Sequence, residues 1–114
     1  MAQARSEVSL DIESLMNEVR KGFPFIPEKY SQLSHCRTEG EILQFCIDHI
    51  LKHVVKQTGK IATEMEAFDH GRPTVNVAEL EKAAAKLLVN ALNLANVLRI
   101  DPKRLVAMAV SELH

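Results

Sequence analysis

Apolar residues in the middle of the chain recur with the period of an α-helix. From about Glu39 or Glu41 to His70 they fall within about 60° of one line at 100° per residue, which predicts a long amphipathic helix. This apolar stripe consists of Ile47, Ile50, Leu51, Val54, Ile61, Met65 and Phe68. Gly59 lies inside the helix and favours a close helix contact or a local bend, and DHGRP ends it.

Three shorter helices are predicted around the long one. Their start signals are Ser6 or Ser9 for a helix at about residues 9–21, Asn76 for VAELEKAAAKLLVNALNLANVLRI, and Asp101 with Pro102 for a last helix to about Leu113. The third helix carries a near-heptad seam of Leu80, Ala84, Leu87, Ala91, Leu94 and Leu98, and further apolar residues widen its surface. No segment alternates with the period of a strand, so the sequence predicts an all-α helical bundle with two long antiparallel helices.

Length and composition indicate one folded domain. The chain has 114 residues, 46% of them hydrophobic, so we expect a single domain over residues 1–114. Within it, residues 1–38 form an N-terminal helix and a connector, FPFIPEKYSQLSHCRTEG, and residues 39–114 form the core helices. A domain of this size with such a wide apolar third helix favours a homodimer or homotetramer.

Charge and cysteine content indicate which kinds of partner and which cellular compartment fit the sequence. With 14 basic and 15 acidic residues the formal charge is −1, which disfavours nucleic-acid binding. Cys36 and Cys46 form no CxxC pair and indicate free thiols in a reducing compartment, the cytoplasm. The sequence shows no signal-peptide pattern and no run of about 18 apolar residues, so we expect no membrane association.

The long helix carries a cluster of residues of the types that bind metals or act as nucleophiles. Helical spacing places Cys46, His49, His53, Lys56 and Lys60 on one side, roughly opposite the apolar stripe. Two histidines four residues apart can share a metal, but no HExxH pattern and no third ligand accompany them. A solvated or interfacial histidine pair is therefore favoured over a metal site, and proximity alone does not make Cys46 a nucleophile.

The third helix carries polar residues within an apolar segment. Lys86, Asn90 and Asn93 align at i, i+4 and i+7. Buried amides must be hydrogen-bonded or they destabilise the fold. Hydrogen bonds between helices of an oligomer and hydrogen bonds to a ligand explain these residues equally well.

The order of elements and two segments of the chain resemble the MazG-like family of all-α nucleoside triphosphate pyrophosphohydrolases. KQTGKIATEMEAFDHG resembles the family's first motif segment, which carries E-E-x-x-E. AAAKLLVNALNLANVLRIDPKRLVAMAVSEL resembles the second, which carries E-x-x-D and continues through an asparagine-containing stretch such as NLAR. The resemblance covers residues 42–112. It implies that two long antiparallel helices form half of a four-helix core, which a second subunit completes, and that four carboxylates in the bundle hold Mg²⁺ while water attacks a phosphate chain.

The positions that correspond to the family's acidic residues are occupied by other side chains in this sequence. The resemblance places Lys56, Gln57, Lys60, Ala83 and Lys86 at these positions, and of the family's site residues the later asparagine alone persists, as Asn93. Ammonium groups repel Mg²⁺, so we expect no magnesium cofactor and no metal site. They can instead contact phosphate directly. The candidate residues for a nucleotide or phosphate ligand are Lys56, Gln57, Lys60, Lys86, Asn90 and Asn93.

Three functions are consistent with the sequence. A repurposed relative would bind a nucleotide or another anion in the old cleft. An active pyrophosphohydrolase would need a displaced acidic cluster, for which Glu64, Glu66, Asp69, Glu79 and Glu81 are available. A structural or interaction protein would fill the cleft with its own side chains, with Lys56 and Lys60 solvated and paired with Glu64.

Overall fold

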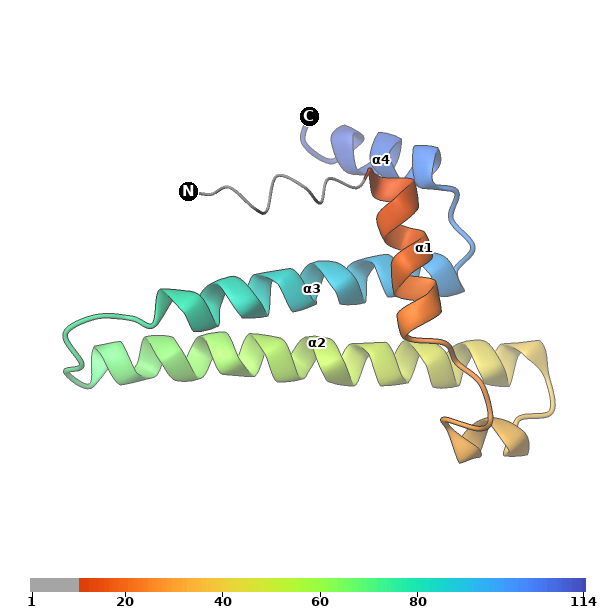
Figure 1. Cartoon of the computed structure of the whole chain (residues 1–114), viewed down its shortest axis with the longest axis horizontal. Helices are drawn as coiled ribbons and strands as arrows, with labels where there is room; N and C mark the ends of the chain where they lie inside the picture. The colour runs from red at the N-terminus through yellow and green to blue at the C-terminus, as the bar shows by residue number, and fades with distance from the viewer. Residues whose placement is uncertain (1–10) are drawn as a thin grey trace.

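The computed structural model describes residues 11–114, which form four α-helices and one short 3₁₀ helix (Figure 1). In chain order they are α1 (Ile12–Gly22), η2 (Ser31–His35), α2 (Glu39–Asp69), α3 (Val77–Val97) and α4 (Pro102–Ser111). Within these residues no strand is present, and α2 and α3 run antiparallel side by side (Figure 1). The predicted all-α class and the long antiparallel pair are confirmed. The short helix η2 inside the connector was not predicted.

Side-chain caps explain where the core helices begin. At the start of α2 the Thr38 hydroxyl accepts a hydrogen bond from the Glu41 backbone N–H, and the Glu41 carboxylate accepts one from the Thr38 N–H. Asn76 caps α3, and Asp101 caps α4 with Pro102 in its first turn. The predicted starts of α3 and α4 are confirmed, because both depended on local cap chemistry.

The first helix begins later than predicted. Asp11 Oδ1 accepts a hydrogen bond from the Ser14 backbone N–H at 2.7 Å, so α1 starts at Ile12 rather than near residue 9. The proposed caps Ser6 and Ser9 lie outside the described residues. The predicted range of about residues 9–21 includes Asp11 in the helix, whereas Asp11 is the residue that caps it.

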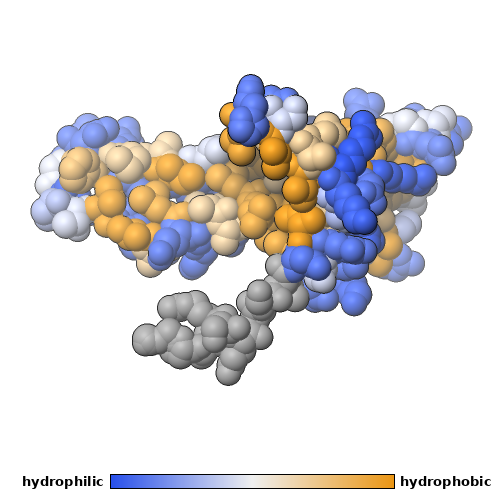
Figure 2. Space-filling model, turned by 90° about the horizontal axis from the view of Figure 1, so that it is seen from above, coloured by the Kyte–Doolittle hydropathy of each residue, from blue (hydrophilic) through white to orange (hydrophobic). Residues whose placement is uncertain are grey.

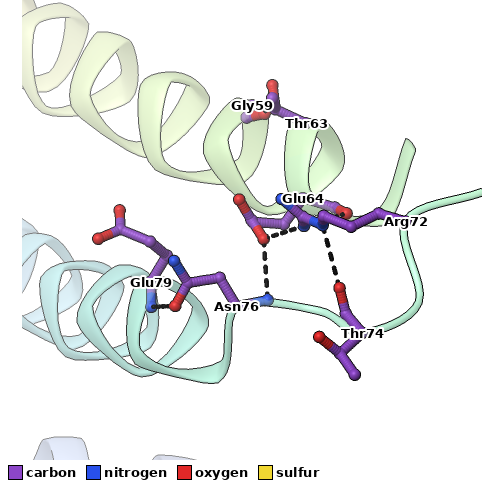
Figure 3. A network of polar contacts seen from close by, with 7 residues as sticks. All are labelled: Gly59, Thr63, Glu64, Arg72, Thr74, Asn76 and Glu79. Carbon is purple, nitrogen blue, oxygen red and sulfur yellow. Dashed lines mark hydrogen bonds and ion pairs between the residues drawn. The ribbon is translucent and has the colours of Figure 1, made fainter. Parts of the chain in front are cut away.

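A polar network fixes the turn between α2 and α3 (Figure 3). Gly71 ends α2 with a φ of +110°, a backbone conformation that favours glycine. The Glu64 carboxylate accepts hydrogen bonds from the Arg72 guanidinium and, at 3.0 Å, from the Asn76 N–H, while Arg72 also donates to the Thr74 carbonyl. The last turns of α2 are thereby tied to the start of α3.

The buried core lies between α1 and α3, near one end of the hairpin. Met16 and Val19 of α1 pack against Leu92 and Ala95 of α3. The Asn96 side chain donates a hydrogen bond to the Met16 carbonyl at 2.9 Å, which satisfies a main-chain acceptor at the contact. This cluster orients α1, and therefore the connector that follows it, against the long hairpin.

The apolar stripe of α2 is only partly buried. The residues of α2 that are buried are Cys46, Ile50 and Gln57, whereas Leu51 is 55% exposed and its neighbour Val55 is 60% exposed. Only part of the predicted stripe is therefore covered. The exposed remainder also includes Met65 and Phe68, which are 42% and 45% exposed near the end of α2.

The seam of α3 is also only partly covered. Ala84, Ala91 and Leu98 are exposed, and Figure 2 shows hydrophobic side chains exposed along the arm of the hairpin. The prediction of a close helix contact at Gly59 is wrong, since a Cβ there would meet no neighbouring atom within 4 Å. No described helix is by itself long and apolar enough to cross a membrane; α3 and α4 meet that criterion only as a pair bent by 120°.

Candidate functional site

A cavity of about 290 Å³ lies between α2 and α3, where the connector after α1 passes over them. Two connector residues, five residues from α2 and four from α3 surround it. They are Phe23 and Tyr30; His49, Ile50, His53, Lys56 and Gln57; and Lys86, Val89, Asn90 and Asn93. Most of these side chains are polar or aromatic, and Ile50 and Val89 are the two aliphatic residues among them.

Five of the six candidate residues from the sequence line this cavity. Lys56 and Gln57 reach it from the middle of α2, and Lys86, Asn90 and Asn93 reach it from successive turns of α3. The antiparallel register brings the two segments opposite each other. The sixth candidate, Lys60, lies one helical turn beyond Lys56 and is not among the lining residues.

Gln57 carries a buried acceptor without a donor. Its side chain is only 4% exposed, and its Oε1 has no hydrogen-bond partner within the part of the chain that the structure describes. Leaving such an acceptor unsatisfied destabilises the protein by about 1–3 kcal/mol. Gln57 also lines the cavity, which places this unsatisfied acceptor beside it.

The amides of α3 behave differently from each other. Asn90 Nδ2 donates to the Lys86 carbonyl of its own helix at 2.8 Å, so its donor is partly satisfied without a partner chain or a ligand. Asn93 is 9% exposed at the base of the cavity. The sequence explained these amides by hydrogen bonds within an oligomer or by hydrogen bonds to a ligand. Because both side chains line the cavity, both can contact a ligand there.

The charges around the cavity are positive. Lys56 and Lys86 line it, and no carboxylate does so among the residues described. A third ammonium group, that of Lys29, lies 5.5 Å from the centroid of the Phe23 ring and 5.8 Å from that of Tyr30, at the connector side. An anion entering the cavity would meet several cations.

Two histidines contribute a further polar wall. His49 Nε2 and His53 Nε2 lie 3.2 Å apart, one helical turn from each other on α2. Burial lowers the pKa of His49, and the nearby His53 and Lys52 lower it further. The sequence singled out both histidines but favoured a solvated or interfacial pair. The structure places them in the cavity wall.

Aromatic residues of the connector complete the wall, and sequence reasoning missed them. Tyr30 lies with its ring centroid 4.7 Å from that of His49, and Phe23 faces the same cavity. The aromatic residues of the connector follow no helical period that would have shown where they pack. The concentration of aromatic residues between Phe23 and Tyr30 was the only available signal.

The residues present do not fit a magnesium site. Among residues 11–114 no group of three or more histidine, cysteine, aspartate or glutamate side chains is arranged to hold a metal ion. Glu64, the central residue of the proposed displaced cluster, is bound to Arg72 and the Asn76 N–H. It is not paired with Lys56 or Lys60, as a solvated-face interpretation would require.

Cys46 has no features of an activated nucleophile. Both cysteines are free thiols, and Cys46 is buried. Burial raises the pKa of the Cys46 thiol, and a higher pKa leaves less thiolate at neutral pH.

The chain matches no protein-family model, no curated protein and no solved structure at a significant level.

Proposed function

We propose that this protein is a divergent MazG-like relative that binds a nucleotide or another phosphorylated small molecule in the cavity between α2 and α3, without magnesium-dependent hydrolysis. The observation that carries the proposal is the combination of two lysines with a buried, unpartnered acceptor in one cavity. The lysines supply charge for a phosphate group. Gln57 supplies an acceptor for a neutral part of the same ligand.

The charge of the cavity favours an anion bound without a metal. Lysine ammonium groups contact phosphate as point charges and need no bridging cation. Lys56 and Lys86 are exposed along part of their length, so they remain hydrated and can adjust to a ligand. Their attraction for phosphate should weaken as salt rises.

The size and the aromatic wall limit the ligand. Ligand sites commonly enclose roughly 300–1,000 Å³, so a cavity of about 290 Å³ holds only part of a nucleotide. Phe23 and Tyr30 offer apolar surface for a ring, and Asn93 offers hydrogen-bonding groups. A phosphate bound at the lysines would leave the rest of the ligand at the open mouth.

Calorimetry with pyrophosphate and nucleoside triphosphates, in the presence of a metal chelator, tests this proposal. Lys56→Met and Lys86→Met should each weaken binding about 10- to 100-fold, since a hydrogen bond to a charged group contributes about 1.5–3 kcal/mol. Lys60→Met is the matched control on the same helix and should change affinity little. Absence of wild-type binding, or equal losses in all three variants, would contradict the proposal.

The alternative of an active pyrophosphohydrolase has a separate test. Pyrophosphate release from the same nucleotides is measured with added Mg²⁺, for the wild type and for Glu64→Gln. We expect no turnover, because the Glu64 carboxylate is held by the α2–α3 turn. Turnover that disappears in Glu64→Gln would show that the acidic cluster assembles and that the protein is an enzyme.

We further propose that a second copy of the chain covers the exposed apolar residues and completes a four-helix core. Leu51 lies two residues from both His49 and His53, so helical geometry places it on the far side of α2 from the cavity. Leu88, 48% exposed, lies two residues from both Lys86 and Asn90 and is likewise on the far side of α3. Exposed apolar residues on long helices are typical of assembly interfaces. A monomer mass in sedimentation at micromolar concentration would contradict this assembly.

A further inference from the structure

The two imidazole rings in the cavity wall are close enough to share one proton. His49 Nε2 and His53 Nε2 are 3.2 Å apart, a hydrogen-bonding distance. An N–H···N bond needs one protonated and one unprotonated nitrogen, so both Nε2 atoms cannot carry a proton in this arrangement. The pair therefore holds at least one nitrogen in the acceptor state.

Aromatic rings hold His49 in place, whereas His53 is exposed. The rings of Phe25, Tyr30 and Phe45 lie with centroids 6.0, 4.7 and 6.1 Å from that of His49. His53 has its ring centroid 4.8 Å from that of His49 and faces the cavity. Between the two, His53 is the ring that is free to reorient.

Cations outnumber anions around this pair in the free protein. On α2, Asp48 is the one acidic neighbour, and it is bound to Lys52 at 2.8 Å. Lys56 of α2 and Lys86 of α3 line the same cavity. The connector contributes Lys29, whose charge opposes protonation of His49, and the phenol of Tyr30. These cations and the burial of His49 disfavour a second positive charge on the pair.

An anion bound at the lysines reverses this balance. Its negative charge favours the imidazolium form of a nearby histidine. A second Nε2 proton breaks the shared hydrogen bond, and the exposed His53 ring is then free to donate its N–H to the anion. We propose that the His49–His53 pair is a further anion-binding element of the cavity, and that it takes up a proton when a doubly charged tetrahedral oxyanion binds.

This inference rests on the proposed function, because the anion must first be attracted by the lysines. By linkage, an anion that promotes proton uptake binds more tightly as the pH falls. The two Nε2 atoms are also near enough to chelate a transition metal. The ammonium groups in the same cavity oppose that use, as does the absence of a third ligand among residues 11–114.

Sulfate is the appropriate probe, because its charge does not change between pH 5.5 and 8.5. The imidazole proton resonances of the full chain are followed by NMR through this range, with and without saturating sulfate and with a metal chelator present. At a given pH we expect the imidazole resonances of the His49–His53 pair to show more protonation when sulfate is bound, and we expect sulfate affinity to fall about 10-fold from the acid to the alkaline end.

His53→Asn removes the exposed member of the pair and leaves the packed His49 ring in place. It should abolish the dependence of sulfate affinity on pH, so that the affinity at pH 5.5 equals that at pH 8.5. His35→Asn, in η2 and outside the cavity, is the matched control and should behave as the wild type.

The outcomes separate the two proposals. Sulfate binding that depends on Lys56 and Lys86 but not on pH would overturn the histidine inference and leave the phosphate site standing. Absence of both sulfate and pyrophosphate binding at every pH would overturn the proposed function itself. Stoichiometric zinc or nickel in protein purified without chelator, lost in His53→Asn, would show a metal site and overturn proton-coupled anion binding.

Discussion

Replacing Gln57 with leucine should make the free protein more stable and its ligand weaker. The side chain is 4% exposed, and its Oε1 has no hydrogen-bond partner among residues 11–114. Leucine removes the unsatisfied acceptor and keeps a side chain of similar length in contact with α3. A buried acceptor without a donor carries a penalty of about 1–3 kcal/mol, and part of the gain is lost to imperfect fit. We expect the free energy of unfolding to rise by about 1 kcal/mol.

Thermal and urea unfolding of the free protein measure this change. A gain of about 1 kcal/mol corresponds to an increase of about 5 °C in Tm for a domain of this size. Sulfate, which carries no proton and therefore no donor for Gln57 at neutral pH, should bind Gln57→Leu about as well as the wild type. A nucleoside triphosphate that uses the amide should bind about 10-fold more weakly, the loss expected for one hydrogen bond of about 1.4 kcal/mol.

Gln44→Leu is the matched control, since Gln44 is an exposed glutamine on the same helix. Its stability should stay within about 0.5 kcal/mol of the wild type, as is usual for surface substitutions. A loss of 1 kcal/mol or more in Gln57→Leu would refute the reasoning, because it would mean that the amide has a structural partner. Unchanged nucleotide affinity would refute the assignment of Oε1 to the ligand.

Three further predictions concern the fold and its assembly. In Glu64→Gln the free energy of unfolding should fall at neutral pH. Hydrogen bonds from the Asn76 N–H and then from Arg72 lower the pKa of Glu64 below its ordinary 4.5. The stabilisation by the ionised carboxylate is therefore present above pH 4.5 and is lost as the pH falls through the lowered pKa. The urea midpoints of variant and wild type should converge in acid. Asp11→Ala should destabilise by about 1 kcal/mol in urea unfolding through loss of the α1 cap, and a change within error would contradict that role. Leu88→Glu should convert the assembly to a monomer in sedimentation while helical circular dichroism persists, and an unchanged mass would exclude this face from the interface.

Local signals in the sequence were sufficient to locate the core helices. Asn76 and the Asp101-Pro102 pair cap helices through contacts within the next turn, so they start a helix whatever the tertiary structure around them. The start of α1 was misplaced because Asp11 is equally acceptable as a cap and as a first-turn residue. Helical spacing and the family resemblance together selected Lys56, Gln57, Lys86, Asn90 and Asn93, which one cavity brings together.

Tertiary contacts decided what the sequence did not. Periodicity shows that α2 has an apolar stripe, but it does not show which angle the helix turns toward α3. The sequence therefore did not show that Gln57 is buried while part of the apolar stripe is exposed. Phe23 and Tyr30 reach the cavity only because α1 packs across α3 and directs the connector over α2, and no local pattern encodes that path.

The offset of the apolar stripe links the cavity to the proposed assembly. If Leu51 and Val55 faced α3, apolar side chains would fill the space between the helices, and Gln57 would lie near solvent. Instead, Gln57 and Asn93 are buried between the helices, where they contribute little hydrophobic stabilisation. Leu51 and Val55 are left exposed on the outer side of α2. Burial of that outer surface by a second copy would supply the missing stabilisation without closing the cavity. We therefore expect dissociation of the assembly to lower stability while the affinity of each remaining folded chain for phosphate stays unchanged.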